Sequence, residues 1–135
     1  MKIDAIYLRE LRIPLVHPFV TSFGATTDRR ILLVELKSEG LTAWGECVAA
    51  EHPYFSEETI DSAWHVLVNE LAPRLAAAEP AQAGECTQLF KAVRGNRMAK
   101  AGLENAVWDL ESQMLGIPLA ELLGGIREKI PCGVS

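Results

Sequence analysis

The feature that most restricts the fold is a long helix predicted over residues 97–115, which ends at Gly116 and Pro118. Its apolar stripe recurs at helical spacing: Leu103, Ala106, Val107, Leu110 and Met114. One more helical turn is predicted over residues 119–123, and the paired glycines Gly124 and Gly125 end it. A helix with one apolar face needs another layer to cover, so the rest of the chain must supply that layer.

The first third of the chain has the patterns of β-strands. Residues 2–15 carry apolar side chains at period two, and residues 30–37 hold a continuous apolar run typical of a central strand. Residues 41–49 return after a tight turn at residues 38–40, where glycine supplies a positive φ. We therefore predict a three-stranded antiparallel meander followed by a helical bundle, which is an α+β fold.

Two more helices are predicted between the meander and the long helix. The first begins at Ser56 as N-cap, with Phe55 and Ile60 forming a hydrophobic staple, and Pro73 kinks or ends it. Its expected buried stripe is Ile60, Trp64, Leu67, Leu71 and Leu75. The second is predicted over residues 81–93. The long helix carries small residues, which predict that a neighbouring helix approaches closely: Ala99, Ala101, Gly102 and Ala106.

Irregular segments are expected at residues 17–29 and 50–55, and both contain aromatic residues. Phe19 and Phe23 lie in the first segment and Tyr54 in the second. Loops usually face water, so aromatic rings there need something to cover. From the residues alone, a ligand, a partner surface and the domain's own core all remain open for Phe19 and Phe23.

Composition excludes several classes of function. The net charge is −5 and no basic run occurs, so nucleic acid is not an expected partner. No apolar stretch is long enough to span a bilayer. The three cysteines (Cys47, Cys86 and Cys132) are odd in number and widely spaced, which favours buried thiols in a reducing cytoplasm. No pattern of histidines or acidic residues predicts a metal site or a catalytic base.

The chain resembles the enolase superfamily. The likeness is greatest to the muconate lactonizing enzyme subgroup, in its o-succinylbenzoate synthase and N-acylamino acid racemase family. The segments that carry it are residues 12–19, 21–24 (Thr-Ser-Phe-Gly), 44–48 (Trp-Gly-Glu-Cys-Val), 96–100 (Asn-Arg-Met-Ala-Lys), 104–109, 122–125 (Leu-Leu-Gly-Gly) and 130–135 (Ile-Pro-Cys-Gly-Val-Ser). The resemblance implies that residues 1–125 form an N-terminal capping domain. Residues 126–135 would then begin a C-terminal (β/α)-barrel, with its first strand at residues 129–135.

In that family the catalytic lysines and the three acidic magnesium ligands come from later barrel strands. The resemblance thus implies that these 135 residues hold no catalytic and no metal-binding residue, and that Mg²⁺ belongs to a longer parent. The parent would remove a proton α to a carboxylate. The outcome is then either dehydration to o-succinylbenzoate, in menaquinone biosynthesis, or racemisation of an N-acylamino acid. The implied partners are the chain's own barrel domain and a small carboxylate substrate, in a homo-oligomer.

The resemblance also assigns a role to the two irregular segments. Residues 17–29 would form a mobile flap over the barrel mouth, and residues 50–55 a second specificity loop. The substrate-binding residues that it implies are Phe19, Thr21, Ser22, Phe23 and Tyr54. Two alternatives stay open: a free-standing binding or assembly module that reuses the cap fold, and the cap of another subgroup enzyme such as a dipeptide epimerase.

Overall fold

The fold is built on a three-stranded antiparallel sheet. The structure is a computed structural model that describes residues 1–22 and 24–133. Its strands are β1 (Ala5–Thr21), β2 (Gly24–Ser38) and β3 (Leu41–Cys47), in the order β1-β2-β3. Glu39 and Gly40 form the two-residue turn between β2 and β3, both at positive φ, as a right-twisted hairpin favours. The predicted meander is confirmed.

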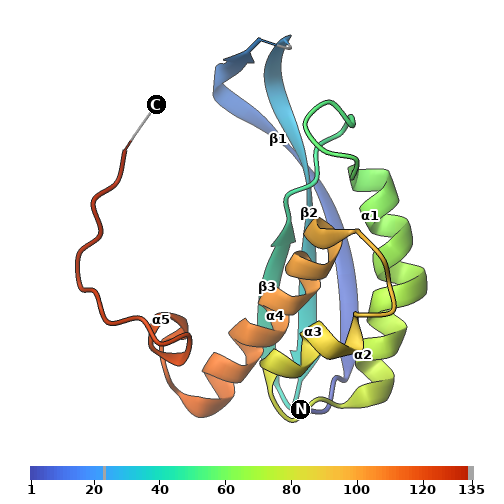
Figure 1. Cartoon of the computed structure of the whole chain (residues 1–135), viewed down its shortest axis with the longest axis vertical. Helices are drawn as coiled ribbons and strands as arrows, with labels where there is room; N and C mark the ends of the chain where they lie inside the picture. Colours follow the sequence, from blue (N-terminus) through green and yellow to red (C-terminus); the bar gives the residue numbers. More distant parts are fainter. Residues whose placement is uncertain (23, 134–135) are drawn as a thin grey trace.

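Residues 17–21 and 24–29 belong to the paired strands of a hairpin, and the prediction that this segment is irregular was wrong. The pairing runs from Ala5 opposite Lys37 to Pro14 opposite Asp28, shifts register, and resumes with Phe19 opposite Thr26. We call residues 14–21 and 24–28 the hairpin arm, which extends past the helices in Figure 1. The prolines and threonines of this stretch remove the apolar alternation that identifies a strand. Backbone pairing to an adjacent strand does not require that alternation.

The first helical segment begins at residue 60. It comprises α1 (Ile60–Val66), the π-helical turn η1 (Leu67–Leu71) and α2 (Ala72–Ala78). Pro73 is the second residue of α2, just after the π-helical turn, so the regular α geometry is interrupted near it, as predicted, but the helix continues.

The predicted start of this helix was wrong in three respects. Its N-cap is Thr59, which forms a capping box with Ser62. Phe55 is 88% exposed and therefore forms no staple. Trp64 is 39% exposed, and Ala63 takes its expected place in the buried stripe. Residue 50 pairs with residue 59 and accepts a hydrogen bond from the Ile60 N–H. The backbone is therefore extended at residue 59, and the helix begins with Thr59 rather than Ser56 as its N-cap.

The remaining helices lie beside and across the sheet. The predicted helix over residues 81–93 is shorter, with a 3-10 turn η2 (Ala83–Glu85) and α3 (Cys86–Leu89). The long helix α4 (Arg97–Leu115) has the predicted bounds and lies across one face of the sheet, as Figure 1 shows. Fully buried side chains of the sheet meet those of the helices in one core: Leu32, Val34 and Leu36 with Ile60, Leu67, Leu103, Val107 and Leu110.

The close neighbour of the small residues on α4 is a strand, which corrects the expected helix. A Cβ atom added to Gly45 of β3 would lie 2.0 Å from the Gly102 carbonyl oxygen. A Cβ atom added to Gly102 would lie 3.0 Å from the Cys47 backbone nitrogen. Asp109 also ties the two elements, because its carboxylate accepts the Trp44 N–H at 2.8 Å. Glycine at 45 and 102 therefore sets how closely α4 approaches the sheet.

The chain after α4 leaves the body of the fold. The predicted short helix is α5 (Leu119–Leu122), and Gly124 follows at positive φ. Residues 129–133 form no strand, contrary to prediction, because none of the three strands pairs with them; residues 134–135 lie outside the described part. Among the described residues no helix has the length and apolar character to cross a membrane.

Two of the three cysteines are buried, as predicted, and the third is not. Burial raises the pKa of the Cys47 thiol and raises that of Cys86 to about 12. Both thiols are therefore protonated near neutral pH and unreactive. Cys132 is exposed, because the segment that carries it does not pack on the core.

Candidate functional site

A groove with a volume of about 910 Å³ lies where the hairpin arm meets the connection from β3 to α1. We call it the arm groove. It is lined by Leu15, Phe19, Thr21, residues 24–30, residues 48–52, Tyr54 and Phe55. One wall is thus the arm with the adjacent part of β2, and the other wall is the irregular segment that follows β3. Both walls extend beyond the end of α1 in Figure 1.

Three of the five implied substrate-binding residues line this groove. Phe19 and Thr21 come from the arm and Tyr54 from the opposite wall, and the Thr21 hydroxyl donates to the Gly24 carbonyl oxygen at 3.3 Å. The Tyr54 ring lies 5.3 Å from the His52 ring, centroid to centroid. Ser22 is exposed at the tip of the arm and is not among the lining residues. Phe23 lies outside the described residues.

The aromatic rings of the groove are strongly exposed. Phe19 is 61% exposed, Tyr54 71% and Phe55 88%. Apolar rings left in water lose the free energy that burial would supply, about 25 cal/mol per Å². Their exposure in one groove fits a surface that is covered when another molecule or domain is bound.

A network of charged side chains, which we call the base of the groove, borders it and contributes Asp28, Arg30 and Glu51 to its lining. Arg12 of β1 and Arg30 of β2 lie directly opposite each other, on the sheet face that carries the core. Arg12 pairs with Asp28, and also with Glu51 at 3.1 Å. Arg30 binds Glu10 at 2.8 and 3.0 Å and Asp61 at 2.7 Å, and its Nη1 lies 3.9 Å from Glu51. Both arginines are therefore engaged with carboxylates of the chain itself.

The pKa shifts follow from these pairs. The hydrogen bond from Arg30 lowers the pKa of Glu10 below 4.5 and that of Asp61 below 3.8. Hydrogen bonds to Glu10 and Asp61 raise the pKa of Arg30, and those to Asp28 and Glu51 raise that of Arg12. Because the carboxyl pKa values fall on folding, their contribution to stability is present near neutral pH. It is lost as the pH falls through the lowered values.

The sequence reasoning missed this network. Charged residues at alternate positions of a strand were the available signal, at 10 and 12 on β1 and at 28 and 30 on β2. On the same face of the sheet, the next side chains along β2 are buried and apolar, such as Leu32 and Val34. Glu51 also belongs to this network, but no local sequence pattern could have indicated its partner, because it lies 39 residues from Arg12.

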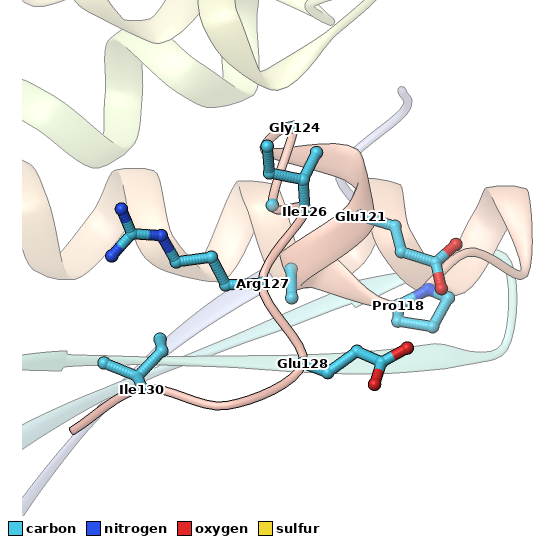
Figure 2. Close-up of a pocket in the computed structure, with 9 residues that line it drawn as sticks. Pro118, Glu121, Gly124, Ile126, Arg127, Glu128 and Ile130 are labelled. Carbon is cyan, nitrogen blue, oxygen red and sulfur yellow. The ribbon is translucent and has the colours of Figure 1, made fainter. Parts of the chain in front are cut away.

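A second hollow, of about 590 Å³, lies at α5 where the chain turns back on itself. Figure 2 shows the Glu121 and Glu128 carboxylates on one side of this chain segment and the Arg127 side chain on the other. Its lining comes only from residues 118–130. It brings together no distant parts of the chain, and we do not assign a site there.

The described residues do not fit a metal centre. Within residues 1–22 and 24–133, no group of three or more histidine, cysteine, aspartate or glutamate side chains is arranged to hold a metal ion. The acidic side chains at the base of the groove are each held by an arginine instead. What this geometry can do chemically is bind and enclose part of a ligand.

Sequence comparison gives the family. Residues 3–124 match the model of the mandelate racemase / muconate lactonizing enzyme, N-terminal domain family. The chain belongs to this family. The sheet followed by helices is therefore the capping domain of the enolase superfamily, as the resemblance implied.

Relatives with two different activities match the whole chain. An o-succinylbenzoate synthase of Geobacillus stearothermophilus is 45% identical over 137 residues, which is 100% of this chain and 36% of that protein. An N-succinylamino acid racemase of Amycolatopsis sp is 43% identical over 135 residues, 100% of this chain and 37% of that protein. The chain thus spans little more than a third of the length of these relatives.

A solved structure confirms the fold. An enolase superfamily member of Enterococcus faecalis V583 superposes with a TM-score of 0.90 at 36% identity, over 98% of this chain and 36% of that one.

Proposed function

We propose that this chain is the N-terminal specificity domain of an o-succinylbenzoate synthase or N-acylamino acid racemase, and that the arm groove is one wall of its substrate pocket. The observation that carries the proposal is the match of the entire chain, at 45% and 43% identity, to relatives with these two activities. In the proposal Phe19, Thr21 and Tyr54 contact substrate. Ser22 and Phe23 remain expected contacts on the resemblance alone.

The role of the chain's own residues is to bind, orient and exclude water. The exposed rings of the groove would cover the apolar part of a carboxylate substrate, which strengthens electrostatic interactions around the reacting carbon. The acid–base groups would come from the remainder of the parent. Mg²⁺ would be held there as well, by the acidic ligands that the family resemblance places on later barrel strands.

The proposed partner domain is the C-terminal barrel of the same parent. Apolar side chains near the end of the chain are exposed and would pack on it: Leu115, Leu123, Ile126 and Ile130. Residues 1–125 are then the cap and residues 126–135 the start of the barrel. Exposed surfaces of this kind also favour a homo-oligomer.

The test is an assay of the complete gene product, with Mg²⁺ present, on the synthase substrate and on an N-succinylamino acid. Turnover of either one supports the proposal, and the ratio of the two kcat/KM values names the principal activity. A gene product that turns over neither substrate would refute it.

Replacing Phe19 with alanine in that gene product is expected to raise KM about tenfold, because the ring would lose apolar contact worth about 1.4 kcal/mol. The control is Val16→Ala, since Val16 lies on the same arm, is 91% exposed and does not line the groove. Steady-state kinetics of both variants provide the measurement. Equal kinetics for wild type and Phe19→Ala would remove Phe19 from the pocket.

A further inference from the structure

The two walls of the arm groove meet through one carboxylate. The arm wall is an antiparallel hairpin, whereas the opposite wall, residues 48–55, is irregular and its residues 51–55 are exposed. Backbone bonds hold the irregular wall to itself and to α1, through Ile60 N to Ala50 O and Tyr54 N to His52 O. The Glu51 side chain reaches from this wall to Arg12, which lies on β1 next to the arm, and to within 3.9 Å of Arg30, which lines the opposite wall.

The position of Glu51 has an electrostatic reason. Arg12 and Arg30 face each other across neighbouring strands, and like charges at such positions repel. Glu10 and Asp61 neutralise Arg30, and Asp28 neutralises Arg12. Among the described ion pairs, Glu51 is the carboxylate shared by both arginines, at 3.1 Å from Arg12 Nη2 and 3.9 Å from Arg30 Nη1.

Burial favours a defined geometry at this point. The Arg30 side chain is only 15% exposed, and it is bound on two sides, by Glu10 of β1 and by Asp61 of α1. Arg30 is therefore fixed to the body of the fold, 3.9 Å from Glu51, whereas the hydrogen bond of Glu51 is to Arg12, whose side chain is 55% exposed. Planar arginine groups hold carboxylates with more geometric restraint than lysine does.

We propose that Glu51 is a positioning residue, whose carboxylate, through Arg12 and the Asp28 that Arg12 binds, couples residues 48–55 to the hairpin arm so that the two walls of the groove keep one relative position. This inference deepens the proposed function and rests on it only for the consequence to substrate. The coupling itself is a property of the 135-residue chain.

Amide hydrogen exchange of the 135-residue chain tests the coupling. Glu51→Gln keeps the shape and removes the charge, and is expected to speed exchange about fivefold in both residues 48–55 and the arm, the factor for an ion pair worth about 1 kcal/mol. Arg12→Gln should act similarly, and the double variant should add little to either. The matched control is Glu57→Gln, which removes the same charge at an exposed position of the same connection. Unchanged exchange in Glu51→Gln, or faster exchange in residues 48–55 alone, would overturn the coupling.

Kinetics of the complete gene product test the consequence, with an N-succinylamino acid as the probe. Glu51→Gln should raise KM about fivefold with kcat within twofold, and Glu51→Asp, which restores the charge, should recover at least half of the loss in kcat/KM. A fall in kcat at unchanged KM would contradict a positioning role. Glu51 also lines the groove, but direct substrate contact would change KM without changing exchange in the unliganded arm. If the gene product has no turnover, the proposed function fails, and the exchange result still decides the coupling.

Discussion

Replacing Gly45 with alanine is expected to lower the free energy of unfolding by about 3 kcal/mol. The added Cβ atom would lie 2.0 Å from the Gly102 carbonyl oxygen and 2.8 Å from the Ala106 backbone nitrogen. Both atoms belong to the backbone of α4, so a side-chain rotation cannot relieve the overlap. The helix must move away from β3, which separates the Asp109 carboxylate from the Trp44 N–H. Urea unfolding followed by tryptophan fluorescence measures the loss.

The control for this substitution is Gly84→Ala. A Cβ atom at Gly84 meets no atom within 4 Å, and its φ is not in the left-handed region. We expect its stability to stay within about 0.5 kcal/mol of wild type. A Gly45→Ala chain as stable as Gly84→Ala would show that α4 does not pack on β3 at this distance.

Replacing Glu58 with alanine is expected to cost about 2–3 kcal/mol of stability. Glu58 is only 5% exposed, and its carboxylate accepts the N–H groups of Met98 and Ala99 at 2.9–3.1 Å. These groups belong to the first turn of α4, where no helical carbonyl is available to them. The negative charge also lies at the positive end of the α4 dipole. Alanine would leave both N–H groups without their acceptor, and urea unfolding again provides the measurement.

Two variants separate this capping role from a general effect of charge. Glu58→Gln keeps an acceptor oxygen and should lose about 1 kcal/mol. Glu57→Ala removes a carboxylate from the exposed neighbouring position and should cost less than about 0.5 kcal/mol. If Glu58→Ala unfolds at the same urea concentration as Glu57→Ala, the carboxylate does not stabilise α4.

The elements that the sequence predicted well are those with a strong local pattern. The period-two strands, the turn at Glu39 and Gly40, and the helix over residues 97–115 all have the expected type. The weaker predictions failed where a tertiary contact decided the outcome. Ser56 is a good N-cap in isolation, but the pairing of Ala50 with Thr59 places the helix start three residues later.

The candidate site shows the same division. Two aromatic residues of the groove, Phe19 and Tyr54, could be singled out from the sequence, because rings in segments predicted to be irregular are conspicuous; the third, Phe55, was assigned to a hydrophobic staple instead. Phe19, Thr21 and Tyr54 do line one groove, whereas Ser22 does not. The charged base of the groove could not be identified, since its members come from two strands, one connection and one helix.

By itself the sequence determined the order of strands and helices and the apolar faces that they bury, because side-chain periodicity reflects the local backbone. The tertiary structure alone decided the pairing of the hairpin arm, the cap that Glu58 places on α4, and the shared contacts of Glu51. Each of these joins groups that no local pattern relates, such as Glu58 and Met98, 40 residues apart. Their partners are chosen by register and by the close packing of α4 on β3, which exist only once the chain has folded.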